Sequence, residues 1–180
     1  MKNFQIELEL RAPRASDGHA VSELIAQCPP LDTNSKYCNL LQCTHFSSTS
    51  VAAFKRGELV GFISGYINPE NPECLFIWQV AIGEQARGLG LATRMLKHIL
   101  ARPYCRDVSY METSITETNE GSWALFKGVA RKFDAEINTT VMFDKERHFQ
   151  GHHDTESLVR IGPFAQIKQI KKSARPVAVA

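Results

Sequence analysis

The segment from Cys74 to Ala101 constrains the fold more than any other part of the chain. Its first nine residues, CLFIWQVAI from Cys74 to Ile82, are almost continuously apolar. An apolar run of this length between turn signals is typical of a strand buried on both faces of a sheet. The glycine-containing stretch GEQARGLG follows, and then a helix predicted from about Gly88 to Ala101, where apolar residues recur at helical spacing. This strand–loop–helix crossover requires a fold that mixes strands and helices.

The remaining patterns predict an α+β fold whose sheet is mixed and mainly antiparallel, with flanking helices. The turn Lys55–Glu58 separates two strands of a predicted hairpin, and Asn68–Glu73 is predicted to be a loop. Further strands are expected at Phe4–Arg11, Val51–Phe54, Leu59–Ile67, Val108–Ile115, Ile137–Phe143 and Ser157–Ile161. Helices are expected between Ser16 and Pro29, around Lys36–Phe46 and at Asn119–Phe133. Residues 1–164 should form a single domain, and residues 165–180 a basic, frayed tail.

Composition excludes several classes of function. A chain of 180 residues with a formal net charge of +2 is too balanced for a dedicated nucleic-acid-binding protein. It contains no apolar run of about 18 residues, and its N-terminus lacks the apolar core of a signal peptide, so we expect a cytoplasmic protein without a membrane segment. The five scattered cysteines form no CxxC pair, and His148, His152 and His153 have no cysteine or paired carboxylates nearby. We therefore expect no disulfide framework and no metal.

The glycine-containing loop has the chemistry of a phosphate-binding turn. The first amides of a helix lack intrahelical partners and carry the positive end of the helix dipole. Glycine at Gly88 and Gly90 lets a phosphate approach the backbone, and Arg87 adds a positive charge. A dinucleotide-binding fingerprint fits less well, because Thr93 stands where its third glycine belongs, and no Lys-Ser/Thr pair completes a P-loop. An ordinary glycine turn is the remaining alternative for this motif taken alone.

Two motifs together resemble the GNAT superfamily of N-acetyltransferases. The string Gln85-x-Arg87-Gly88-x-Gly90-x-Ala92 is similar to its coenzyme A pyrophosphate-binding motif, and Asn119-x-x-Ser122-x-x-Leu125-Phe126 to its second signature. The resemblance implies acetyl-CoA as cosubstrate, bound where two parallel strands splay apart, with the backbones of Val80 and Ile82 pairing with the pantetheine arm. It further implies that the amides of Arg87, Gly88, Leu89, Gly90, Leu91 and Ala92 hold the pyrophosphate, and that Asn119, Ser122 and Phe126 line the other wall.

Longer blocks narrow the resemblance to the L-2,4-diaminobutyrate acetyltransferases of ectoine biosynthesis. These blocks are CPPLDTNSKY (Cys28–Tyr37), NLLQCTHF (Asn39–Phe46), GFISGY (Gly61–Tyr66), LFIWQVA (Leu75–Ala81) and Glu112-Thr113. The resemblance implies transfer of acetyl to the γ-amino group of L-2,4-diaminobutyrate, in a cytoplasmic enzyme of osmotic stress, and we expect a homodimer. Acetylation of another small amine, or a non-catalytic acyl-CoA sensor, are the alternatives. The dense polar set between Asp32 and His45 argues against a sensor, which needs no amine pocket.

A diamino acid presents two ammonium groups and one carboxylate, and the chain offers matching side chains. Asp32 and Glu112 can supply negative charge, while Trp78 offers an aromatic wall or a cation–π face. Neutral hydrogen-bonding candidates are Asn34, Tyr37, Asn39, His45 and Gln79. Asp32 could instead be only a turn residue, and Trp78 is as consistent with a core position as with a pocket.

The expected mechanism is direct transfer to the amine. Glu112 is the first candidate for the general base, and Asp32 is the second or, in preference, an ammonium anchor. The amide of Val80 is expected to hold the oxyanion. Phe126 stands where many superfamily members have a tyrosine, so the acid is Tyr37 or Tyr110, or the thiolate leaves unaided. Direct transfer needs no thiol nucleophile, and we expect Cys38 and Cys43 to be inert.

Overall fold

The computed structural model describes residues 8–164, which contain a mixed seven-stranded sheet with the strand order β1-β2-β3-β4-β5-β7-β6. Most strand pairs are antiparallel and one is parallel. The described chain divides into two compact units, one made of residues 8–67 and 76–105, the other of residues 68–75 and 106–164. Strand β4 contributes its first residues to the second unit and the rest to the first. The basic tail predicted at 165–180 lies outside the described residues.

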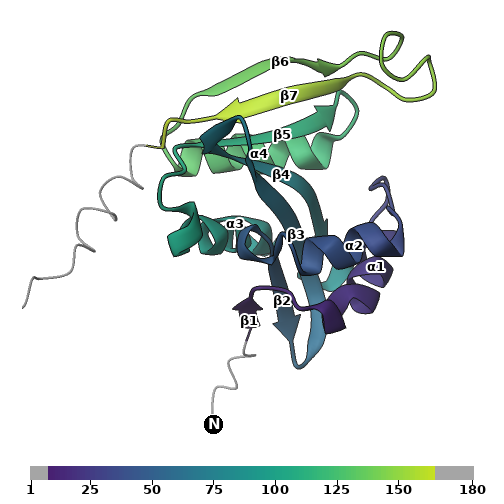
Figure 1. Ribbon diagram of the computed structural model, residues 1–180, viewed down its shortest axis with the longest axis vertical. Coiled ribbons are helices and arrows are strands. Elements are labelled where there is room, and N and C mark those ends of the chain that lie inside the picture. The colour runs from purple at the N-terminus through teal and green to yellow at the C-terminus, as the bar shows by residue number, and fades with distance from the viewer. Residues whose placement is uncertain (1–7, 165–180) are drawn as a thin grey trace, which may run out of the picture. The chain divides into compact units, whose positions relative to one another are not determined.

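The elements follow one another along the chain as Figure 1 labels them. The strands are β1 (Leu8–Arg11), β2 (Val51–Lys55), β3 (Glu58–Asn68), β4 (Asn71–Ile82), β5 (Tyr110–Thr116), β6 (Ile137–Phe143) and β7 (Glu156–Ile161). The α-helices are α1 (Gly18–Ala26), α2 (Lys36–Cys43), α3 (Leu91–Leu100) and α4 (Glu120–Lys132). Short 3-10 turns are η1 (Ala15–Asp17), η2 (Ser47–Thr49), η3 (Glu84–Ala86) and η4 (Pro103–Cys105). No helix in this part of the chain is long and apolar enough to cross a membrane.

The predicted hairpin and the predicted crossover are both confirmed. Arg56 and Gly57 turn the chain between β2 and β3 with φ values of 55° and 81°. Positive φ at both central positions is the geometry of a type I′ turn, which matches the twist of the two strands. Of the strand predicted at Phe4–Arg11, the structure describes Leu8–Arg11, and the earlier residues lie outside the described part.

Three predicted boundaries were wrong. The helix expected from about Gly88 begins at Leu91, because Gly88 and Gly90 have left-handed φ values that no α-helix contains. The loop expected at Asn68–Glu73 is mostly strand, since β3 extends to Asn68 and β4 starts at Asn71. Backbone pairing there, including the bond from the Ser109 amide to the Glu73 carbonyl at 2.8 Å, outweighs the low strand propensity of these residues. Helix α2 ends at Cys43 instead of Phe46, because Thr44 leaves helical geometry.

In the first unit, α1 and α3 cover opposite faces of the sheet. Phe62 packs into a core cluster with Val21 and Ile25 of α1. At the preceding position, Gly61 faces α3: a Cβ there would lie only 3.0 Å from the Met95 sulfur. Successive strand residues point to opposite faces, so this pair of neighbours determines which helix lies on each side. Helices α1 and α2 lie side by side (Figure 1).

In the second unit, β7 lies between β5 and β6 in antiparallel register. Val159, in the middle of β7, is completely buried, as is Val129 of α4. The rings of Phe133 and Phe164 close one end of this core with centroids 5.2 Å apart. The antiparallel register also decides which polar side chains of β5 and β7 lie opposite each other.

Candidate active site

The glycine-containing loop leads from β4 into α3 without any side chain that caps the helix. The Gly83 amide donates to the Val60 carbonyl at 2.9 Å, which ties the start of the loop to β3. Gly90 is the N-cap of α3, with no side-chain cap and no acidic residue in the first turn. The first-turn amides therefore keep their hydrogen-bonding capacity and the positive end of the helix dipole for an anion.

Gly88 and Gly90 are needed for their backbone geometry. Their φ values are 74° and 71°, a left-handed backbone region that residues with a Cβ adopt only at a cost in conformational energy. A Cβ built at either position meets nothing within 4 Å, so the space above the turn is open. An uncapped helix start, open space and left-handed glycines together fit a pyrophosphate.

The residues around this turn are placed as follows. Arg87 is exposed, and its Nε donates to the Ile82 carbonyl at 2.9 Å, so the guanidinium is anchored beside the turn. Leu89 is 72% exposed, while Leu91, the first residue of α3, is buried. Val80, Ile82 and Ala92 are half-buried. Arg87 thus adds a positive charge, anchored by this bond, beside the turn.

The second signature lies at the start of α4. Asn119 is the N-cap, and its Oδ1 accepts from the Ser122 amide at 3.1 Å. Phe126 is 2% exposed and belongs to the core of the second unit. Trp123 Nε1 donates to the Thr116 carbonyl at 3.1 Å and ties the helix to the end of β5. The spacing of Asn119 and Ser122 therefore has a local cause, which is the capping of α4.

A hydrogen-bond network shapes the loop between Asp32 and Ser35. Asn34, with a φ of 56°, donates from Nδ2 to Gln79 Oε1 at 2.9 Å, and Gln79 Nε2 donates to the Asp32 carbonyl. Asn39 Nδ2 donates to Ser22 Oγ at 3.0 Å and to the Thr33 carbonyl at 3.3 Å. Asn39 and Gln79 are buried, so these amides hold the loop against α1 and β4. The Asp32 carboxylate stays exposed and accepts the Asn34 amide at 3.2 Å.

Three other predicted residues of this unit point outward. Tyr37 is 72% exposed, His45 is exposed, and Trp78 is 42% exposed although it lies in a strand with buried neighbours. Trp78 meets the rings of Tyr66 and Phe46 edge-on, each with centroids 6.3 Å away. Its position is thus the edge of an aromatic cluster with an open face, and a core position is excluded.

Glu112 lies in the second unit and is paired. Its Oε1 accepts from Arg160 Nη1 at 2.6 Å, and the Glu112 side chain is only 9% exposed. The Arg160 guanidinium lies over the Tyr110 ring, 4.1 Å from its centroid. Burial and the neighbouring Glu112 carboxylate raise the pKa of the Cys74 thiol to about 12. Sequence patterns did not single out Arg160 or Cys74, because only the register of β5 with β7 and the packing of β4 bring them to Glu112.

Comparison with known proteins agrees with this geometry. Residues 18–129 match the acetyltransferase (GNAT) family. The chain belongs to this family. It is 58% identical over 161 residues to the L-2,4-diaminobutyric acid acetyltransferase of Methylotuvimicrobium alcaliphilum, covering 89% of this chain and 94% of the relative. The L-2,4-diaminobutyric acid acetyltransferase of Vibrio parahaemolyticus is 50% identical over 151 residues, which cover 84% of this chain and 83% of the relative.

A solved structure of a diaminobutyrate acetyltransferase also matches this GNAT chain over most of its length. Diaminobutyrate acetyltransferase EctA from Paenibacillus lautus, in complex with its substrate L-2,4-diaminobutyric acid and coenzyme A, superposes with a TM-score of 0.84. The two are 39% identical, and the match covers 88% of this chain and 96% of that one. The predicted α+β GNAT fold with a mixed, mainly antiparallel sheet is therefore confirmed.

Cys38 and Cys43, the two cysteines beside His45 in the sequence, are poor nucleophiles at neutral pH. Burial and the nearby Asp32 charge raise the pKa of Cys38, and burial followed by the charge of Asp17 raises that of Cys43 to about 11. Both thiols therefore stay protonated at neutral pH, as expected for inert cysteines. Within residues 8–164, no group of three or more His, Cys, Asp or Glu side chains is arranged to hold a metal ion.

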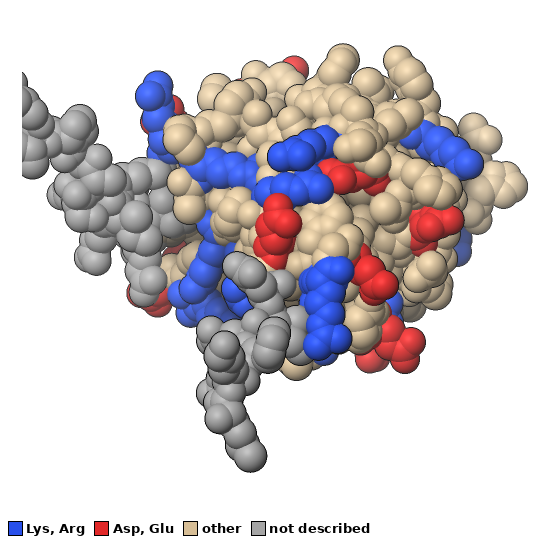
Figure 2. Space-filling view, turned by 90° about the horizontal axis from the view of Figure 1, so that it is seen from below, with Lys and Arg blue, Asp and Glu red and all other residues tan. Residues whose placement is uncertain are grey.

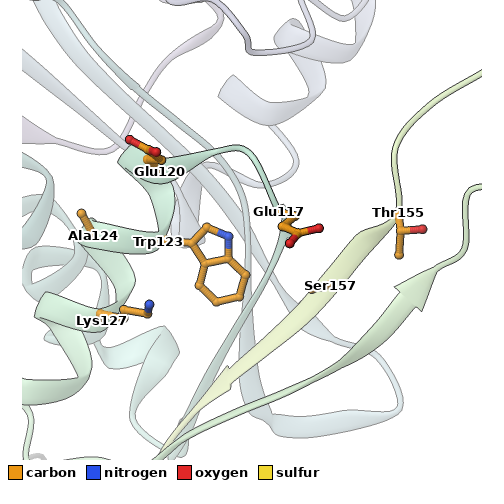
Figure 3. Close-up of a pocket in the computed structure, with 7 residues that line it drawn as sticks. All are labelled: Glu117, Glu120, Trp123, Ala124, Lys127, Thr155 and Ser157. Carbon is orange, nitrogen blue, oxygen red and sulfur yellow. The ribbon is translucent and has the colours of Figure 1, made fainter.

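A separate cavity of about 670 Å³ lies between α4 and β7 in the second unit. Figure 3 shows the Trp123 ring at its centre, with Glu117 and Lys127 on either side. Lys127 Nζ lies 5.4 Å from the centroid of this ring. The lining residues are Glu117, Glu120, Trp123, Ala124, Lys127, Thr155 and Ser157, none of which the sequence analysis assigned to the site.

Proposed function

We propose that this protein transfers the acetyl group of acetyl-CoA to the γ-amino group of L-2,4-diaminobutyrate. The product is N4-acetyl-L-2,4-diaminobutyrate, and the reaction belongs to ectoine biosynthesis. The observation that carries the proposal is the match, over 88% of the chain, to an enzyme solved with this substrate and coenzyme A. The 58% identity to a second acetyltransferase of the same name supports it independently.

The cosubstrate site is assigned residue by residue. The first-turn amides of α3 and the exposed Arg87 guanidinium hold the pyrophosphate, which the open space above Gly88 and Gly90 admits. The backbone amides of Leu89, Leu91 and Ala92 also bind the pyrophosphate. Val80 and Ile82 pair with the pantetheine arm, and Asn119 and Ser122 contact the cosubstrate from the start of α4. Phe126, expected from the sequence to line this wall, is buried in the core and supports α4 from behind. Acetyl-CoA supplies an activated thioester carbonyl. The protein binds and orients the reactants and moves protons, and the amine is the nucleophile.

The amine side uses the exposed groups of the α2 region. Asp32 anchors an ammonium group, and Trp78 and Tyr37 present exposed aromatic surface beside it. His45 contributes a hydrogen bond. Asn34, Asn39 and Gln79 shape the pocket by holding the Asp32–Ser35 loop. Asn34 donates to Gln79, Gln79 to the Asp32 carbonyl, and Asn39 to Ser22 of α1. Their amides act on the substrate mainly by fixing Asp32.

Transfer requires that the ammonium first lose a proton. An alkyl ammonium has a pKa of about 10.4, so at neutral pH few molecules are nucleophilic without a base. Glu112 takes this proton, directly or through water, and Asp32 is the alternative base. The neutral nitrogen then bonds to the acetyl carbon while the Val80 amide stabilises the oxyanion. The carbon–sulfur bond breaks, and the nitrogen, positively charged after the attack, gives up its second proton to water. The thiolate leaves unaided or takes a proton from Tyr37 or Tyr110.

A thiol-release assay tests the activity. The purified protein receives acetyl-CoA with diaminobutyrate, diaminopropionate, ornithine, lysine or spermidine, and released thiol is measured over time. We expect the highest kcat/KM with diaminobutyrate. Faster turnover of another amine would contradict the substrate assignment, and binding of acetyl-CoA without turnover of any amine would favour the sensor alternative.

Localisation and assembly complete the proposal. We infer a cytoplasmic homodimer of single-domain chains that binds neither nucleic acid nor membrane. The near-neutral charge supports the absence of nucleic-acid binding. On the face shown in Figure 2, basic and acidic side chains are interspersed and form no uniformly basic patch. Light scattering of the purified protein measures its oligomeric state directly.

A further inference from the structure

The Glu112–Arg160 pair is a cross-strand pair in the middle of β5 and β7. The two residues are direct partners in the antiparallel register, and Arg160 Nη1 lies 2.6 Å from Glu112 Oε1. The two side chains differ in exposure: Glu112 is 9% exposed and Arg160 is 35% exposed. The carboxylate is therefore enclosed while part of the guanidinium faces solvent.

The guanidinium has more donors than this pair uses. An arginine side chain carries five N–H donors in a planar fork. Among residues 8–164, the hydrogen bond that the Arg160 side chain donates goes to Glu112 Oε1. On the other side, β6 places Asn138 opposite Arg160, so the neighbouring strand supplies no second carboxylate. As far as residues 8–164 are concerned, the remaining donors of the fork are available to a ligand.

The orientation of the fork is fixed before any ligand binds. Glu112 holds one nitrogen, and the guanidinium carbon Cζ lies over the Tyr110 ring, 4.1 Å from its centroid. Two independent contacts restrict the side chain, so little conformational entropy remains to be lost on binding.

We propose that Arg160 binds the α-carboxylate of the amino-acid substrate, and this inference rests on the function proposed above. A guanidinium binds a carboxylate through two parallel N–H···O bonds, which gives both affinity and orientation. The adjacent Glu112 carboxylate is then near an ammonium group of the same molecule. In an extended diaminobutyrate chain, the γ-nitrogen lies about 5 Å from the carboxyl carbon, from bonds of about 1.5 Å. Arg160 thus selects diamino acids over simple diamines.

The test compares diaminobutyrate with 1,3-diaminopropane, which is the same molecule without its carboxylate. Thiol release gives kcat/KM for both amines in the wild type, in Arg160→Met and in Arg160→Lys. Loss of the partner of Glu112 slows both amines, but Arg160→Met should lower kcat/KM for diaminobutyrate by roughly 10- to 150-fold more than for diaminopropane, the value of hydrogen bonds to a charged group. Arg160→Lys keeps the charge beside Glu112 but loses the fork, so it should lose part of the preference.

A matched control separates this role from the loss of an ion pair. Arg11→Met removes a comparable pair, in which Arg11 Nη1 lies 2.7 Å from Asp17, in the other unit. It should leave the ratio of the two kcat/KM values unchanged. If Arg160→Met slows both amines by the same factor, Arg160 only positions Glu112, and the inference is wrong. If Arg160→Met does not fold, an unchanged ratio in Arg160→Lys overturns it equally.

The wild-type enzyme tests the two proposals separately. Equal kcat/KM for diaminobutyrate and diaminopropane would overturn carboxylate recognition while leaving acetyl transfer to diaminobutyrate intact. No thiol release with diaminobutyrate would instead overturn the proposed function. Thermal unfolding of each variant shows whether a lost activity reflects a lost fold.

Discussion

Replacing Gly90 with alanine is expected to weaken acetyl-CoA binding more than it destabilises the protein. Gly90 has a φ of 71°, and a Cβ there meets nothing within 4 Å in the free protein. The methyl group therefore clashes with no protein atom, and two separate effects follow. One is backbone strain, which is present with or without ligand. The other is the loss of the close approach that a phosphate needs.

The strain can be estimated from the backbone. A left-handed residue with a Cβ costs about 1–2 kcal/mol. The smaller conformational freedom of alanine in the unfolded chain offsets about 0.4–1 kcal/mol of this. The net loss in the free energy of unfolding is then about 1 kcal/mol, which lowers Tm by roughly 2–4 °C for a chain of this size. Displacing a phosphate from one charge-assisted amide bond costs about 1.5–3 kcal/mol, which raises the KM for acetyl-CoA roughly 10- to 150-fold.

Gly57 provides the matched control. It has a φ of 81°, a Cβ there also meets nothing within 4 Å, and it lies in the β2–β3 turn. Gly57→Ala should therefore lower Tm by a similar amount and leave the KM for acetyl-CoA unchanged. Calorimetry measures Tm, and thiol release at varied acetyl-CoA measures KM. If Gly90→Ala binds acetyl-CoA normally, or if Gly57→Ala raises KM equally, the pyrophosphate does not lie at this turn.

Three further predictions concern the base, the product and the response to acid. Glu112→Gln should lower kcat by roughly 10²- to 10⁴-fold with little change in the KM for acetyl-CoA, and higher pH should partly restore the rate because more amine is then neutral. Asp32→Asn should mainly raise the KM for diaminobutyrate; if Asp32→Asn slows turnover instead while Glu112→Gln does not, the two roles are exchanged. NMR of the product should place the acetyl group on the γ-nitrogen, and a mainly α-acetylated product would contradict the substrate assignment. The hydrogen bond from Arg11 lowers the pKa of Asp17 below its ordinary value of 3.8, so the stability from this pair is complete above that value and is lost as the pH falls through the lower, folded pKa. Asp17→Asn should therefore flatten the fall in the free energy of unfolding below about pH 4, measured by urea titration, and an unchanged slope would refute the linkage.

The assignment of the phosphate-binding turn needed only local sequence. Gly88 and Gly90 lie between a continuously apolar strand and an amphipathic helix, and their backbone preference acts within a few residues. The same holds for the hairpin at Arg56 and Gly57, and for Asn119, whose side chain caps α4 three residues ahead. Each of these features depends on neighbours in the chain, so the pattern that predicts it is complete in the sequence.

The surroundings of the charged groups depended on the tertiary structure. Glu112 was identified in the sequence as a carboxylate in a strand, but its partner Arg160 is 48 residues away and depends on which residues of β5 and β7 are opposite. A shift of one residue in that register would turn Arg160 to the other face of the sheet. Gln79 and Asp32, which are 47 residues apart, illustrate the same point for the loop before α2. Local periodicity shows which face of an element is buried, whereas strand register and helix packing decide which polar side chains meet, because those contacts depend on the pairing of the whole sheet.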